Sequence, residues 1–229
     1  MIAHTNKEVA LAAANRSSLL DRLEPLVIVG PGLFAFLILM QDLIEWDWLI
    51  KAGLNPIHQG PVSALAWSPI GLVQMANFFI LGLATVSLAM LFNKTVARNR
   101  FTYPAFAMLL MVGVALMAST LRVDYIPIRG RSFINPPALH WMGVIHNIAF
   151  FFVAFPVTFG LWLVWARLRK DPRFKSASRH TLVQAIVMVP VVVVLFIGPV
   201  NIFYFWLVVW LSWQTHLAIR VRQVSQSAT

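Results

Sequence analysis

The sequence predicts an all-α, polytopic membrane helix bundle with six transmembrane helices and both termini in the cytoplasm. Three observations support this fold class. Hydrophobic residues make up 59% of the 229-residue chain and charged residues only 11%, whereas soluble domains carry roughly 25% charged residues. Long apolar runs alternate with short polar segments. The basic residues gather in alternate polar segments, as the positive-inside rule expects for an even number of spans.

The N-terminal segment, residues 1–24, is expected to be cytoplasmic or interfacial. Positions 8–23 permit a mildly amphipathic helix, with a frayed tail as the alternative. Glu8 and Asp21 lie in it without an early apolar core, so it is not a signal peptide. The transmembrane domain is expected over residues 25–220, followed by a polar tail over 221–229.

The apolar runs define the spans in order. The first span, residues 25–41, is short, because ~20 residues cross a ~30 Å hydrocarbon core. Residues 181–219 carry no charge and are too long for one span at about 1.5 Å per residue. A Gly-Pro pair near their middle divides them into two helices. The spans after the first are therefore expected at residues 69–92, 101–121, 138–165, 182–197 and 201–219.

The distribution of basic residues sets the expected orientation. Of the 18 Lys and Arg residues, four fall in the predicted outer loops and the remainder in cytoplasmic segments. The net charge of +10 therefore reflects membrane topology, and we expect the lipid bilayer rather than nucleic acid as partner. A multi-pass location in a prokaryotic inner or plasma membrane follows. The absence of cysteine excludes disulfides and thiolate metal sites.

Polar side chains suited to binding concentrate at the predicted outer ends of the first four spans. Asp42 and Glu45 are three apart and share a helix face, although solvated helix ends are the alternative. Asp124 follows the third span and His140 opens the fourth, so both can face one cavity. The alternatives are an Asp124 pair with a loop arginine and a His140 bond to a loop carbonyl. The tentative ligand-binding residues are Asp42, Glu45, Ser63, Asp124 and His140.

A zinc site is the alternative use of this outer cluster. Its ligands would be His58, Asp124 and His140, with the Ser63 hydroxyl nearby. No HxxxH or HExxH pair enforces the site, and Ser63 could instead cap the second span. His146 does not share a helix face with His140, so we expect a buried polar contact with another helix. A heme clamped between helices is unsupported.

Several short motifs carry a resemblance to a known family. They are the stretch 61–83, PVSALAWSPIGLVQMANFFILGL, then Asp124, His140 and a closing helix hairpin with a late tryptophan. Over roughly residues 27–213 the chain resembles a family of six-span bacterial and archaeal membrane proteins, domain of unknown function 998. The resemblance implies the six-span fold and brings no established activity. The chain departs from the family pattern at Ala64, where an acidic residue often stands, and lacks an arginine after Gly198-Pro199.

Three functions remain open from the sequence. The leading hypothesis is a non-enzymatic protein that binds a lipid-like or pigment-like ligand, or an accessory subunit of a larger membrane complex or homo-oligomer. It follows from extensive aromatic and methionine surface beside no strong catalytic spacing. The alternative is a metal-dependent membrane hydrolase with an outward-facing Asp/His/Ser site. A small transporter is the third hypothesis. Two observations argue against it: no charged residue is expected at mid-membrane, and no inverted repeat is visible.

Overall fold

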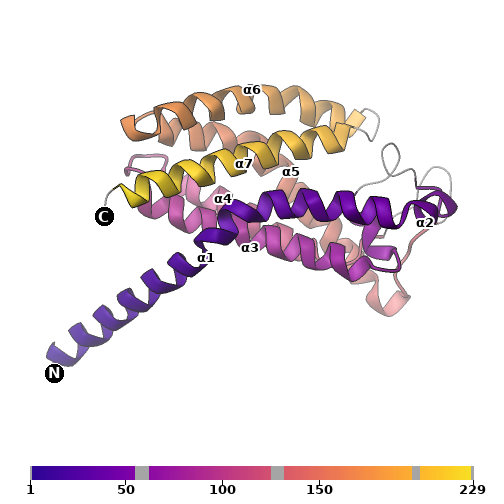
Figure 1. Ribbon diagram of the computed structural model, residues 1–229, viewed down its shortest axis with the longest axis horizontal. Helices are drawn as coiled ribbons and strands as arrows, with labels where there is room; N and C mark the ends of the chain where they lie inside the picture. The colour runs from indigo at the N-terminus through magenta and orange to yellow at the C-terminus, as the bar shows by residue number, and fades with distance from the viewer. Residues whose placement is uncertain (1, 55–61, 125–131, 198–201, 228–229) are drawn as a thin grey trace.

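The computed structural model describes residues 2–54, 62–124, 132–197 and 202–227, for residues 2–22 the backbone alone (Figure 1). Every long element in these ranges is helical, which confirms the all-α fold class. The α-helices are α1 (Ile2–Ile44), α2 (Trp46–Lys51), α3 (Gly71–Thr95), α4 (Thr102–Ala118), α5 (His140–Leu168), α6 (Lys175–Ile197) and α7 (Ile202–Gln226). The short 3-10 helices are η1 (Val62–Trp67), η2 (Pro137–Leu139) and η3 (Pro172–Phe174).

The long helices form a closed ring, which we call the helix ring. Going round it, α1 packs on α3, α3 on α4, α4 on α5, α5 on α6, α6 on α7, and α7 back on α1. In addition, α3 reaches across the ring to contact α7. The two ends of the chain lie at one end of the bundle and α2 at the other (Figure 1). We call the end that holds α2 the α2 end.

Four helical segments of the described chain are long and apolar enough to cross a membrane: Leu23–Ile44, Gly71–Thr95, Pro137–Leu168 and Pro172–Leu195. They match the predicted first, second, fourth and fifth spans. The predicted third span corresponds to α4, which is apolar but only 17 residues long. The predicted sixth corresponds to α7, and the expected hairpin of two helices is present as α6 and α7. The Gly-Pro pair between them lies outside the described residues.

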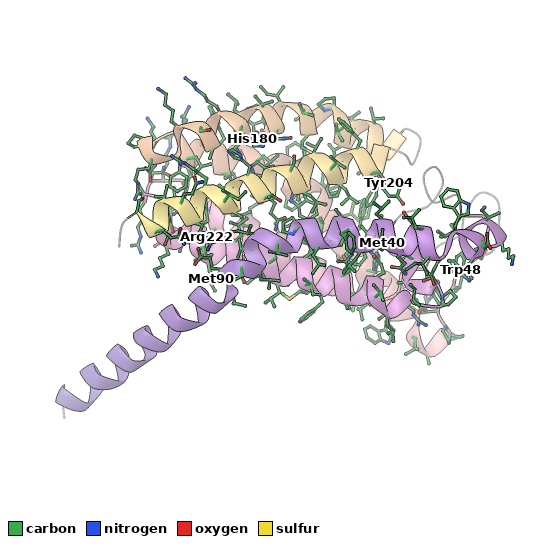
Figure 2. All side chains as sticks on the ribbon, viewed as in Figure 1. Met40, Trp48, Met90, His180, Tyr204 and Arg222 are labelled. Atoms are coloured by element: carbon green, nitrogen blue, oxygen red, sulfur yellow. The ribbon has the colours of Figure 1, made fainter. Side chains whose placement is uncertain are left out.

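The N-terminal segment, predicted as an interfacial or cytoplasmic helix, is helical in the structure. Its backbone continues without a break into the first span, so that α1 runs for 43 residues and its first half extends away from the bundle (Figure 1). Glu24 of α1 pairs with α7, since its Oε1 lies 2.8 Å from Arg222 Nε; Figure 2 shows Arg222 on α7. The junction joins α1 to the C-terminal part of the ring.

Close helix contacts depend on two glycines that face each other. A Cβ on Gly82 of α3 would lie 2.7 Å from the Gly113 carbonyl oxygen of α4, and a Cβ on Gly113 would lie 2.9 Å from the Gly82 carbonyl. Any side chain at either position would therefore push the two backbones apart. Small residues of this kind let membrane helices approach closely, because dispersion rather than hydrophobicity drives their association.

The end of the ring opposite the α2 end is fastened by buried polar contacts. Arg167 is fully buried, donates to the Val96 carbonyl at 2.9 Å and stacks on Phe92. Asp171 accepts from the Ala97 amide at 3.0 Å and from Arg173 Nη2 at 2.7 Å. The hydrogen bonds from Arg173 hold the pKa of Asp171 below its usual value. These contacts join the α3–α4 connection to the α5–α6 connection.

Candidate functional site

A cavity of about 330 Å³ lies inside the helix ring. We call it the central cavity, and its volume falls within the ~300–1,000 Å³ typical of ligand pockets. Its walls are apolar and strongly aromatic, and each helix of the ring contributes to them. The apolar lining side chains are Phe34, Val62, Phe78, Leu116, Val123, Phe150, Val153, Leu195, Phe203, Trp206, Leu207 and Trp210.

One end of the central cavity is polar. This polar end consists of Ser63, Ser119, Asp124, His146 and Asn147. They come from η1, from the C-terminal end of α4 and the residues that follow it, and from the second turn of α5. All of these segments lie toward the α2 end. The cavity therefore combines apolar, aromatic walls with a cluster of hydrogen-bonding groups toward the α2 end, and Nε1 of Trp206 is a buried donor without a partner among the described residues.

The structure brings together two of the predicted site residues, Asp124 and His140. Asp124 Oδ2 lies 2.7 Å from His140 Nδ1, and Oδ1 accepts from the Asn135 amide at 2.7 Å and from Asn135 Nδ2 at 2.8 Å. Gly143 makes room for this carboxylate, because a Cβ there would lie 2.3 Å from Oδ2. Asp124 thus ties the α4–α5 connection to the start of α5.

The predicted pair of Asp124 with a loop arginine takes a different form. Arg122 stacks on the Trp67 ring, with its guanidinium carbon 5.2 Å from the ring centroid, and makes no ion pair in the described chain. Arg129 and Arg131 lie outside the described residues. Among the described groups, the imidazole of His140 is the ion-pair partner of this carboxylate.

His146 lines the cavity, although the sequence assigned it no site role. Its Nδ1 lies 2.6 Å from the Leu121 carbonyl oxygen, which confirms the expected buried contact with a neighbouring helix segment. A carbonyl oxygen only accepts hydrogen bonds, so Nδ1 carries the proton and Nε2 keeps a lone pair. The sequence signal that could have placed His146 inside the bundle was its position almost two turns into the predicted fourth span.

Ser63 also lines the cavity, and the alternative that it caps the second span does not hold. It is buried in η1, whereas α3 begins at Gly71. The amide just before α3, that of Ile70, donates to Glu45 Oε1 at 2.9 Å. The side chain that accepts a hydrogen bond at the start of α3 is therefore that of Glu45, and the Ser63 hydroxyl lies at the polar end of the cavity.

Asp42 and Glu45 form a separate buried cluster rather than solvated helix ends. They are only 8% and 5% exposed. Gln41 Nε2 donates to Glu45 Oε2 at 3.2 Å and to Ser68 Oγ at 2.9 Å, and Asp42 lies 3.5 Å from the hydroxyl of Tyr204, beside α1 (Figure 2). Neither carboxylate lines the central cavity, so the five predicted residues belong to two sites.

The donor set for zinc is incomplete in the described part of the chain. His58 lies outside it, and no three His, Asp or Glu side chains within it come close enough to hold a metal ion. Asp124 and His140 supply two ligands, whereas catalytic zinc in proteins takes three. Moreover, the Asp124 oxygens are already engaged by Asn135 and His140. The described residues do not fit a zinc site.

Beyond the cavity, a polar contact joins α3 to α7 where they meet across the ring. Gln214 Nε2 donates to Thr85 Oγ1 at 3.0 Å, and both residues are buried. One helical face of α3 also carries Asn77, which donates to the Phe34 carbonyl at 3.0 Å. Sequence reasoning passed over these residues, although their spacing along the second span places them on one face.

Comparison of the chain with protein-family models, curated proteins and solved structures found no match. The resemblance to domain of unknown function 998 therefore stays a prediction. The functional argument rests on the central cavity and its polar end.

Proposed function

We propose that this chain is a six-span membrane protein that binds a lipid-like or pigment-like small molecule in its central cavity. The observation that carries the proposal is an apolar, aromatic cavity of about 330 Å³ inside the helix ring, with polar groups at one end. Pockets with mostly apolar walls and a few convergent polar groups are the usual form of small-molecule sites.

The walls suit a ligand with an elongated apolar body. Phe34 and Phe78 meet with ring centroids 5.5 Å apart, and Trp206 and Trp210 with centroids 5.3 Å apart. An apolar void deprives its lining atoms of dispersion contacts, and an acyl chain, isoprenoid or fused ring system would restore them. The polar end would then fix which way the ligand points.

Six spans with both termini in the cytoplasm is the topology we propose. It is supported by α4 and α7 completing the ring between the longer spans, and by both ends of the chain lying at the same end of the bundle (Figure 1). At about 1.5 Å per residue, the 17 residues of α4 reach about 25 Å, close to the ~30 Å hydrocarbon core. Basic residues gather at the end that holds the termini.

Ligand extraction tests the binding proposal. Protein purified in mild detergent from its own membranes is extracted with organic solvent, and the extract is analysed by mass spectrometry. Val153→Phe fills the cavity, because Val153 lines it and is 4% exposed. Val114→Phe makes the same change on the outward face of α4, where Val114 is 52% exposed.

A single species retained by the wild type and Val114→Phe and lost from Val153→Phe is the expected result. Extracts that contain only bulk membrane lipid in wild-type proportions, unchanged by either variant, would overturn the proposal. A co-purifying protein chain in place of a small molecule would support the accessory-subunit alternative instead.

A membrane hydrolase is the second candidate, favoured by the 2.7 Å pair of Asp124 and His140 beside Ser63 at the polar end. This candidate requires His58 to complete a metal site with Asp124 and His140. It predicts about one zinc ion per chain in purified protein and loss of that zinc in His140→Ala. Metal analysis that finds no zinc in the wild type removes this candidate and leaves the binding proposal intact.

A further inference from the structure

We infer that the ligand of the central cavity is an uncharged amphiphile whose head group is a hydroxyl, such as a long-chain alcohol, a monoacylglycerol or a sterol-like alcohol. This inference rests on the proposed function and names the chemical class of its ligand. It follows from the charge of the cavity lining and from the hydrogen-bonding atoms left open at the polar end.

The charge of the described lining disfavours an anionic head group. No Lys or Arg is among the described residues that line the cavity. A carboxylate or phosphate bound there would have no cationic partner among the described lining residues, and burial of an unpaired charge is strongly unfavourable. Phospholipids and ionised fatty acids therefore do not match this site.

A cationic head group is also disfavoured. Asp124 is the carboxylate in the described lining, and its two oxygens already accept from the Asn135 amide, Asn135 Nδ2 and His140 Nδ1. Each of these distances lies between 2.7 and 2.8 Å, so both oxygens make short, charge-assisted contacts. A ligand amine would have to displace one of them.

The Ser63 hydroxyl and the Asn147 carboxamide at the polar end make no hydrogen bond with a described residue, whereas the His146 ring bonds the Leu121 carbonyl through Nδ1 and also the Ser119 backbone. Trp206 adds a buried Nε1 donor that has no partner among the described residues. With Nδ1 protonated, Nε2 of His146 can accept, and Ser63 and Asn147 can each donate or accept. A hydroxyl donates one hydrogen bond and accepts others, so it satisfies this set.

The same set discriminates among uncharged ligands. A quinone or ketone carries acceptors only, so it could accept from Trp206 Nε1 or the Ser63 hydroxyl but could not donate to Nε2 of His146. A carotene-like hydrocarbon would leave the buried Ser63 hydroxyl and Trp206 Nε1 without a ligand partner, whereas Asn147 is exposed. Leaving a buried polar group unpaired is what makes a hydrogen-bonding site selective against an analogue that lacks the matching group.

Photoaffinity labelling tests the inference on the detergent-purified full chain. Two probes carry a mid-chain diazirine and differ only in the head group, tetradecanol and tetradecyl sulfate, the latter charged at every accessible pH. Labelled peptides are located by mass spectrometry. Unlabelled tetradecanol, tetradecyl sulfate, tetradecyltrimethylammonium and tetradecane compete at equal concentration.

We expect the alcohol probe to label cavity residues of α5 and α7, and only unlabelled tetradecanol to compete strongly. Ser63→Ala should weaken competition by tetradecanol about three- to tenfold, because it removes one hydrogen bond. It should not change competition by tetradecane. Ser87→Ala is the matched control, since Ser87 is equally buried, bonds to the Leu83 carbonyl and lies outside the cavity lining.

The outcomes separate this inference from the proposed function. Cavity labelling by both probes with equal competition, or stronger labelling by the sulfate, overturns the hydroxyl head group and leaves ligand binding in place. Labelling that neither probe directs to cavity residues overturns both. An unchanged response of Ser63→Ala and Ser87→Ala to tetradecanol also overturns the role given to the polar end.

Discussion

Replacing Gly143 with alanine should disrupt the polar end of the cavity through a single added methyl group. A Cβ at this position would lie 2.3 Å from Oδ2 of Asp124, 2.5 Å from its Cγ and 3.0 Å from its Cβ. Carbon atoms approach each other at about 3.5 Å in ordinary contacts. Because Gly143 lies in the first turn of α5, where the backbone is fixed by the helix, the carboxylate must withdraw by about 1 Å.

The loss can be worked out from the bonds that Asp124 makes. Its bonds with the Asn135 amide and Nδ2, now 2.7 and 2.8 Å, would exceed the ~3.2 Å limit of a good N–H···O bond. At ~1.5 kcal/mol or more for each bond to a charged acceptor, the cost is about 3 kcal/mol. His140 adds under ~1 kcal/mol, because its side chain is 58% exposed. Alanine's better helix propensity returns ~1 kcal/mol.

A net loss of about 2 kcal/mol corresponds to a fall in Tm of roughly 4–8 °C on the scale of soluble domains of this size. Thermal unfolding in detergent, followed by tryptophan fluorescence, measures it. Gly32→Ala is the matched control: the same change in helix α1, at an exposed position where a Cβ meets nothing within 4 Å. This control should keep or slightly raise Tm.

The reasoning also predicts a functional effect. Asp124 lines the central cavity, so its displacement in Gly143→Ala should weaken labelling by the tetradecanol probe, whereas Gly32→Ala should label like the wild type. A Gly143→Ala protein with the Tm of Gly32→Ala and unchanged labelling would refute the assignment of Asp124 to the polar end.

Three further predictions concern the Asp171 contacts at the end of the ring opposite the α2 end, the α3–α7 contact and the topology. Because Arg173 lowers the pKa of Asp171 below 3.8, Asp171 should stabilise the fold above about pH 4 and cease to do so as pH falls through its folded pKa. The Tm difference between wild type and Asp171→Asn should therefore shrink from pH 6 to pH 3; a constant difference contradicts this. Gln214→Leu should lower the free energy of unfolding, measured by thermal unfolding, by only about 1 kcal/mol, because Thr85 still donates to the Leu81 carbonyl. A variant that no longer folds would contradict this expectation. In this cysteine-free chain, Lys51→Cys should react with an impermeant maleimide in intact cells and Ser176→Cys only after lysis; equal reactivity rules out the proposed orientation.

The helix positions could be read from the sequence because apolar run length is a local property. The expected spans 69–92 and 138–165 lie within three residues of α3 and α5 at each end. The charge-free stretch 181–219 was correctly divided into two helices, since no single span needs that length. The continuous 43-residue α1 was missed, because residues 8–23 permit a helix without showing where it ends.

The site was only partly predictable, because it depends on the order of helices round the ring. Asp124 and His140 flank one short connection, and the structure places their side chains 2.7 Å apart, although only Asp124 lines the central cavity. Asp42 and Glu45 were expected to join them, but α1 borders α3 and α7, not α4 or α5. No pattern along the chain states which helices are neighbours.

The position of the central cavity follows from where α3 and α7 meet. These two helices touch across the ring at Thr85 and Gln214, far along α3 from its start at Gly71. Toward the α2 end the same helices contribute Phe78, Phe203 and Trp206 to the cavity lining. The contact therefore closes one half of the ring, and the space left open is bounded by the carboxylate, imidazole and hydroxyl that the α2 end supplies. Without the α3–α7 contact, the ring would not be closed on the side of the cavity away from the α2 end.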